Sequence, residues 1–262
     1  MKMRILYPSN PLNDKEADEP YQEEFLEAKK AGLACSLFDF DALSFNEFRP
    51  KPRIEQDEKV LYRGWMLNIE LYERLCCFIS KKGGVPITNP ETYEKCHHLP
   101  GWYDKCSKFT PETHIFEYGE GMIEEINKLG WESYFVKDFV KSNSNEVGSI
   151  AKNGEEAYEI AKLIEKYRGN IEGGVAIRRV ENFIPETEQR YFVVNEVPYS
   201  PTDDMPKIVE EISNIIDAPF YTIDTIRRED GEYRLVEVGD GQVSEKKLWP
   251  MSNFVGVLAK NA

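Results

Sequence analysis

Cysteine is scarce in this sequence, and its spacing does not indicate paired thiols. The five cysteines are Cys35, Cys76, Cys77, Cys96 and Cys106, an odd number without a CxxC pair. Disulfide-stabilised domains carry even numbers of cysteines, and zinc fingers use characteristic spacings. We therefore expect reduced thiols and neither a disulfide framework nor a zinc finger.

Long apolar segments are absent as well. The longest apolar stretches, such as residues 71–79, are too short and too often interrupted to span a bilayer. Residues 1–8 lack the apolar region of a signal peptide. The sequence therefore predicts a cytoplasmic protein without a membrane partner.

Positive charge is in the minority. The chain has 47 Asp and Glu residues against 33 Lys and Arg, a formal net charge of −14. Broad binding to nucleic acid or to anionic membranes uses a basic surface, so this balance argues against both, although a local basic pocket would be compatible with it. With 41% hydrophobic residues in 262, the chain can build a substantial core in one large domain or two smaller ones.

Three familiar catalytic motifs are missing. The sequence has no GxxxxGK[ST] loop, no GxGxxG after a predicted strand and no GxSxG elbow. These absences exclude a P-loop, a Rossmann dinucleotide fingerprint and the nucleophile of an α/β-hydrolase. Any phosphate site must therefore be built from other groups.

Residues 1–90 alternate between strand and helix patterns, which predicts a parallel sheet covered by helices. The expected strands are 3–7, 34–38, 60–62 and 85–88, and the expected helices are about 21–31 and 68–80. Ligands usually bind beyond the carboxyl ends of parallel strands. Asn10 and Arg63 follow two of these strands, so we predict that they line a substrate pocket; a structural ion pair is the alternative for Arg63.

Residues 91–262 have a different pattern and are predicted to form a second domain. Residues 90–120 are expected to be an irregular junction, because prolines and glycines interrupt them. An antiparallel α+β pattern follows. Its expected strands are 133–141, 174–180 and 190–195, its helices about 155–167 and 206–216, and its last element a hairpin over 221–244.

Two acids lie inside the apolar strands of this last hairpin. Asp224 is within YTIDTI and Glu237 within LVEV, and a turn signal at 229–231 separates the two strands. A buried, ionised carboxylate costs several kcal/mol unless it is paired or binds a metal. Because Mg²⁺ takes carboxylates together with water and phosphates, we predict that Asp224 and Glu237 bind Mg²⁺, with Asp240 as a possible third ligand.

Basic residues also lie inside apolar strands, which is informative in an acidic chain. Lys137 and Lys141 share one face of a strand, Arg178 and Arg179 lie on opposite faces of another, and Arg190 opens a third. Singly, each could be an exposed residue or the partner of an acid. Together with Asp224 and Glu237 they could hold a triphosphate and transfer its γ-phosphate.

The order of these residues resembles the ATP-grasp superfamily. More narrowly, FVKDFVKS at 135–142, RYFVV at 190–194 and EVGDGQVS at 237–244 resemble a clade of predicted ATP-grasp amide ligases characterised by two arginines and a lysine. The resemblance covers most of the chain. It implies a Rossmann-like pre-ATP-grasp lobe, residues 1–90, followed by a two-subdomain ATP-grasp fold with antiparallel sheets, residues 91–262.

The resemblance also implies roles for individual residues. Many members have Glu-x-Asn on the last metal-binding strand, whereas this chain has Gly239 at the third position and Asp240 after it, so the third ligand stays open. The implied roles are phosphate binding by Lys137 and Lys141 with Lys108 or Lys105 as a further lysine, adenine binding by the backbone near Val180 and Glu181, contact with the γ-phosphate by Arg190 and one of Arg178 or Arg179, and Mg²⁺ binding by Asp224 and Glu237.

The implied activity is an ATP- and Mg²⁺-dependent carboxylate–amine ligase that works through an acylphosphate. Its partners would be ATP and small-molecule or peptide carboxylates and amines. The polar loop 142–153 is either a lid over the acylphosphate or an ordinary surface loop. One alternative keeps the ATP site in an RNA-end ligase or a kinase, although the charge of −14 weighs against RNA. Another is a non-catalytic nucleotide-binding module, against which the intact Lys137, Arg190, Asp224 and Glu237 argue.

Overall fold

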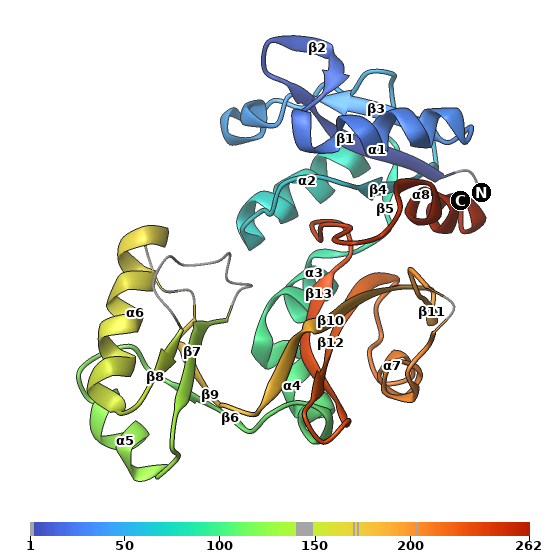
Figure 1. The fold of residues 1–262 in the computed structure, drawn as a ribbon. Helices are drawn as coiled ribbons and strands as arrows, with labels where there is room; N and C mark the ends of the chain where they lie inside the picture. The colour runs from blue at the N-terminus through green and yellow to red at the C-terminus, as the bar shows by residue number, and fades with distance from the viewer. Residues whose placement is uncertain (1–2, 140–148, 170, 172, 203) are drawn as a thin grey trace. The chain divides into compact units, whose positions relative to one another are not determined.

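The computed structural model describes residues 3–139, 149–169, 171, 173–202 and 204–262 (Figure 1). The chain forms two compact units, each made from separate stretches of sequence. Unit 1 comprises Met1–Cys96, Arg190–Ile223 and Gly239–Ala262, and unit 2 comprises His97–Gln189 and Asp224–Val238. The predicted division into residues 1–90 and 91–262 stays a prediction.

The predicted parallel sheet is present in unit 1. Its strands are β1 (Met3–Asn10), β3 (Ala34–Phe38), β4 (Lys59–Tyr62) and β5 (Val85–Pro86). β1 pairs in parallel with β3 and β4, and β4 pairs in parallel with β5. A further strand, β2 (Asn13–Ala17), pairs antiparallel with the end of β1.

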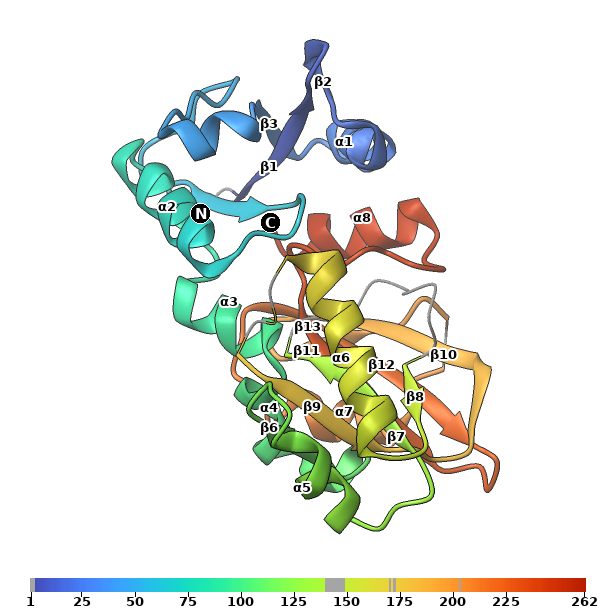
Figure 2. The same cartoon turned by 90° about the vertical axis from the view of Figure 1, so that its left-hand side faces the viewer.

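Helices cover both faces of this sheet, as Figure 2 shows for α1 (Glu19–Lys30) and α2 (Ile69–Lys81). Ile5 of β1 belongs to the same buried core as Phe25 of α1, whereas Leu6 belongs to a second core with Leu75 of α2. Neighbouring residues of a strand point to opposite faces, so both faces are apolar, as is typical of parallel sheets. The first core also contains Phe254 of the last helix, α8 (Met251–Lys260).

A second sheet, in unit 2, is antiparallel and has the order β6-β9-β7-β8. Its strands are β6 (Thr113–Phe116), β9 (Val175–Arg179), β7 (Tyr134–Asp138) and β8 (Ile150–Ala151), and the helices α5 (Met122–Lys128) and α6 (Gly154–Arg168) pack against it. Val136 and Ile177 are partners across β7 and β9 and lie in the core with these helices. Lys137 and Arg178, the next residue on each strand, therefore lie on the opposite face.

A third sheet has the order β11-β10-β12-β13. Its strands are β11 (Val197–Tyr199), β10 (Phe183–Val194), β12 (Phe220–Arg228) and β13 (Tyr233–Asp240), and α7 (Lys207–Ser213) precedes β12 in the chain. β12 and β13 form the predicted hairpin; Arg228 N donates to Glu232 O at 2.8 Å, and Gly231 adopts φ 90°, which favours glycine. β10, β12 and β13 each contribute residues to both units.

The predicted irregular junction at 90–120 is wrong. The structure has α3 (Pro90–His97), α4 (Leu99–Cys106), a 3-10 turn at Ser107–Phe109 and β6 in this region. Pro90 is the first residue of its helix and Pro100 lies in the first turn of the next, positions where the missing N–H costs nothing. Tyr93 and Trp102 are buried, so packing stabilises both helices. A further 3-10 helix lies at Asp41–Phe45.

Two expectations concern the cysteines and the membrane. All five cysteines are free thiols, as the sequence predicts. Among the residues that the structure describes, no helix has both the length and the apolar character needed to cross a lipid bilayer.

Candidate functional site

The central feature of unit 2 is an ion pair between a predicted phosphate ligand and a predicted metal ligand. Lys137 Nζ, on β7, donates to Glu237 Oε1, on β13, at 3.0 Å. Only 6% of the lysine side chain and 14% of the glutamate side chain are exposed. A pair so shielded is screened little by water, and each group gives the other a partner in a place where an unpaired charge would be costly.

Arg178 of β9 lies against the same strand as Glu237. Its Nε donates to Thr113 Oγ1 at 3.3 Å, and its Nη1 donates to Val236 O at 2.8 Å. Nη2 is buried and has no hydrogen-bond partner among the described residues. Burial lowers the pKa of this guanidinium, and the charge of Glu237 opposes that effect. An incompletely satisfied, buried guanidinium is a favourable position for an anionic ligand.

Asp224 provides the second predicted metal ligand of unit 2. Asp224 is buried on β12, and Glu237 lies on β13, the strand that neighbours β12 in the sheet. Within the described ranges, no group of three or more His, Cys, Asp or Glu side chains is gathered as a metal site. Two carboxylates still fit Mg²⁺, a hard cation that commonly takes one or two protein carboxylates and completes its shell with water and phosphate oxygens.

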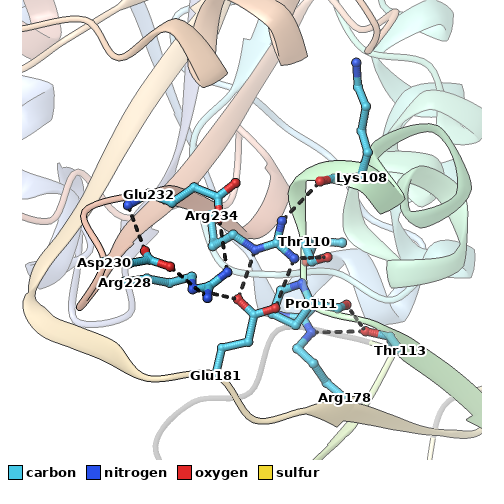
Figure 3. A network of polar contacts seen from close by, with 10 residues as sticks. All are labelled: Lys108, Thr110, Pro111, Thr113, Arg178, Glu181, Arg228, Asp230, Glu232 and Arg234. Atoms are coloured by element: carbon cyan, nitrogen blue, oxygen red, sulfur yellow. Dashed lines mark hydrogen bonds and ion pairs between the residues drawn. The ribbon is translucent and has the colours of Figure 1, made fainter.

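The predicted adenine segment, Val180 and Glu181, connects β9 to β10. The Glu181 carboxylate accepts from Arg234 Nε and Nη2, both at 3.0 Å, and lies 3.8 Å from Arg228 Nε (Figure 3). Arg234 was not among the predicted site residues. The criterion that selects Lys137, a basic residue inside an apolar strand, selects Arg234 equally well.

The remaining predicted residues of unit 2 differ in exposure. Arg179 is exposed, in contrast to Arg178. The exposed Lys108 places its ammonium 4.4 Å from the centre of the Phe109 ring, and its side chain points away from Arg234 in Figure 3. Lys141 and residues 142–148 of the predicted lid loop lie outside the described residues.

Arg190, predicted to contact the γ-phosphate, is buried on β10 in unit 1. Its Nη1 donates to Glu245 O at 2.7 Å, and its own backbone carbonyl accepts from Trp249 Nε1 at 2.8 Å. The segment after β13 therefore holds this arginine at both its side chain and its main chain.

Arg63, predicted to line a substrate pocket or to form a structural ion pair, is buried among hydrogen-bond acceptors of unit 1. It is 2% exposed, and its Nε and Nη2 donate to the two carboxylate oxygens of Glu24 at 2.9 and 2.8 Å. Nη1 donates to the carbonyls of Gly241, Gln242 and Ser244. These contacts support the structural ion pair that the sequence leaves open.

Asp240, the possible third metal ligand, is buried in unit 1. Its Oδ1 accepts from Gln242 N at 2.9 Å and from Gln242 Nε2 at 3.2 Å, while Oδ2 has no hydrogen-bond partner among the described residues. Burial raises the pKa of this carboxyl to about 7, and the hydrogen bonds from Gln242 oppose the rise. A neutral Asp240 would be a poor ligand for Mg²⁺ until a cation displaced its proton.

Asn10, the other predicted substrate residue, lies at the end of β1. Its Oδ1 accepts from Leu12 N at 2.8 Å. It lines a pocket of about 260 Å³ in unit 1 together with Asp39, Arg49 and Lys51. Residues of both charges thus surround this pocket at the carboxyl ends of β1 and β3.

Comparison with protein families gives a match to the second half of the chain, which includes Lys137, Arg178, Asp224 and Glu237. The sequence model of an ATP-grasp domain, R2K clade family 3, matches residues 128–258, which is half of the 262 residues. No curated protein matches the sequence.

Several solved structures have a similar fold along almost the whole chain. A RimK domain ATP-grasp protein from Sphaerobacter thermophilus is 15% identical with a TM-score of 0.65, and 98% of each chain is covered. The D-alanine-D-alanine ligase from Coxiella burnetii is 11% identical with a TM-score of 0.63, covering 100% of this chain and 95% of the ligase. The macrocyclase MdnC from Microcystis aeruginosa, bound to its precursor peptide MdnA, is 13% identical with a TM-score of 0.60, covering 98% and 100%.

Proposed function

Because the chain belongs to R2K clade family 3 of the ATP-grasp domains, we propose that it is an ATP- and Mg²⁺-dependent ligase that joins a carboxylate to an amine. The family match confirms the predicted resemblance, and the solved structures confirm the predicted fold class. The observation that carries the proposal is the Lys137–Glu237 ion pair beside Arg178, within the matched residues.

Each member of this group has a role that follows from its charge. Lys137 would bind phosphate oxygens of ATP, and Arg178 would offer its buried Nη2 to the γ-phosphate. The role of Arg190 at the γ-phosphate stays a prediction. Asp224 and Glu237 would hold Mg²⁺, which neutralises charge on the phosphates when it is bound. Lys137 and Glu237 neutralise each other in their ion pair, so neither charge is buried alone.

The proposed reaction has two steps. A carboxylate oxygen of one substrate attacks the γ-phosphorus, and the bond to ADP breaks, giving an acylphosphate and ADP. An amine then attacks the acyl carbon, loses a proton and displaces inorganic phosphate, which leaves an amide. No protein nucleophile is needed, because positioning and charge stabilisation carry both steps.

We propose that the substrates are amino acids or peptides. We also propose that the protein is located in the cytoplasm. The similar structures include a D-alanine-D-alanine ligase and a macrocyclase bound to a precursor peptide. The net charge of −14 also disfavours a polynucleotide acceptor. The pocket beside Asn10, with Asp39, Arg49 and Lys51, carries charges that complement an amino acid's amine and carboxylate.

The test is a screen for ADP release with ATP, Mg²⁺ and pairs of carboxylates and amines, followed by mass spectrometry of the products. We expect an amide, ADP and phosphate in equal amounts, and loss of turnover by at least about a hundredfold in Glu237→Gln, the cost of removing one charge that stabilises the transition state. Glu232→Gln is the matched control, because Glu232 is an exposed acid of the same hairpin. ATP-dependent modification of RNA ends instead of amide formation would contradict the proposal.

A further inference from the structure

The segment between β9 and β10 is fixed through the side chain of Glu181. Arg234 Nε donates to one carboxylate oxygen and Nη2 to the other, both at 3.0 Å. The arginine side chain is 12% exposed and the glutamate side chain 17%. This two-bond geometry fixes the direction of the Glu181 side chain as well as its distance.

Arg234 also binds two backbone carbonyls of a distant segment. Nη1 donates to Lys108 O at 3.1 Å, and Nη2 donates to Thr110 O at 2.8 Å (Figure 3). One guanidinium thus joins β13, the segment ahead of β6 and the connection from β9 to β10. An arginine is suited to this because its donors are rigid and coplanar.

The segment at residues 108–113 contacts the proposed phosphate site as well. Thr113 Oγ1 donates to Pro111 O at 3.0 Å and accepts from Arg178 Nε at 3.3 Å. The same short stretch therefore supports Arg178 at one end and Arg234 at the other (Figure 3). Arg178, which would bind the triphosphate, and Arg234, which holds Glu181, therefore belong to one hydrogen-bonded network.

We propose that Arg234 is a positioning residue for the nucleotide base: by holding the carboxylate of Glu181, it sets the backbone of Val180 and Glu181 for adenine. The inference rests on the proposed function, because that function assigns adenine to this backbone. The carboxylate of Glu181 is engaged by Arg234, so Glu181 serves the base through its main chain. The contacts of Arg234 are with Glu181, Lys108 and Thr110, and the proposed function assigns none of these side chains to the reacting atoms.

The test separates binding of the base from binding of the phosphates. Isothermal titration with ATP and with inorganic tripolyphosphate, both with Mg²⁺, is compared for the wild type, Arg234→Gln and Arg234→Lys. We expect Arg234→Gln to weaken ATP binding roughly tenfold, the order of one charge-assisted hydrogen bond, and to leave tripolyphosphate binding within about twofold. Arg234→Lys should be intermediate, because a lysine cannot reproduce the two-bond geometry.

Retained tripolyphosphate binding guards against a simple loss of folding, because it shows that the phosphate site of the Arg234→Gln variant is intact. Arg228→Gln is the matched control: Arg228 reaches Glu181 only at 3.8 Å and pairs more closely with Asp230 at 2.8 Å and Glu232 at 3.0 Å, so its ATP affinity should not change.

Three results would overturn the inference. Arg234→Gln could bind ATP as tightly as the wild type, or it could lose ATP and tripolyphosphate binding equally; both would overturn the inference and leave the proposed function in place. A wild-type protein that binds neither ligand would overturn the proposed function, and the base site with it.

Discussion

Replacing Asp240 with asparagine should remove a large pH dependence of stability. Burial raises the pKa of this carboxyl from 3.8 to about 7 in the folded protein. Between these values the unfolded chain releases the proton while the folded chain keeps it, so rising pH favours unfolding. Above about pH 7 both states are ionised and no further stability is lost.

The expected magnitude follows from that difference. One pKa unit corresponds to about 1.4 kcal/mol, so a change from 3.8 to about 7 corresponds to about 4 kcal/mol. Between pH 5 and pH 7 the wild type should lose about 3 kcal/mol of its free energy of unfolding, at about 1.4 kcal/mol per pH unit. The introduced asparagine side chain would resemble the protonated acid, because its carbonyl oxygen can still accept from Gln242 N. The variant should therefore match the wild type near pH 4 and exceed it at pH 8.

The assay is urea unfolding, followed by tryptophan fluorescence at pH 5, 6, 7 and 8 in EDTA, so that no divalent cation competes with the proton. Trp249 is buried in the same unit and reports its unfolding. Asp217→Asn, at an exposed acid of that unit, is the control and should retain the wild-type pH dependence. A difference in unfolding free energy between Asp240→Asn and wild type that is the same at pH 5 and pH 8 would refute the reasoning.

Two further substitutions test the buried arginine and the buried lysine. Arg63→Met should lower the free energy of unfolding by about 3–5 kcal/mol in urea titrations, because it leaves the charge of Glu24 buried without its partner. Adding Glu24→Gln should restore part of that loss, and an equally unstable double variant would contradict the ion-pair explanation. Lys137→Met should weaken tripolyphosphate binding by at least about tenfold in calorimetry, as expected for a lost charge-assisted contact. Lys162→Met, at an exposed lysine of the same unit, should have no effect, and equal affinities in all three proteins would remove Lys137 from the phosphate site.

Local patterns predicted the helices well where apolar periodicity and caps agree. Asn68 accepts from Leu71 N and begins α2, and Asn153 accepts from Glu156 N and begins α6. β2 was missed because NDKEA has no apolar alternation; backbone pairing with β1 stabilises it instead. Backbone pairing of this kind does not depend on the side chains, so the residue pattern does not reveal it.

For the candidate site as well, the sequence indicated single residues but not the contacts between them. Lys137 and Glu237 were each selected by a charge inside an apolar strand, but their ion pair joins residues 100 positions apart, which no local pattern reveals. The contacts of Arg63 reach even farther, to carbonyls 178 to 181 residues later. The sequence therefore identified candidates for chemistry better than it identified their partners.

The three carbonyls that bind Arg63 also set the order in which the protein can fold during its synthesis. Ser244 is made 181 residues after Arg63, a delay of roughly 10–40 s at a typical ribosomal rate of about 5–20 residues per second. Until then the guanidinium lacks three of its acceptors, and the side of the first sheet that carries Ile5 lacks Phe254. For most of translation, α1 therefore covers this apolar face without α8, and a premature stop before α8 would leave the part that Phe254 covers exposed permanently.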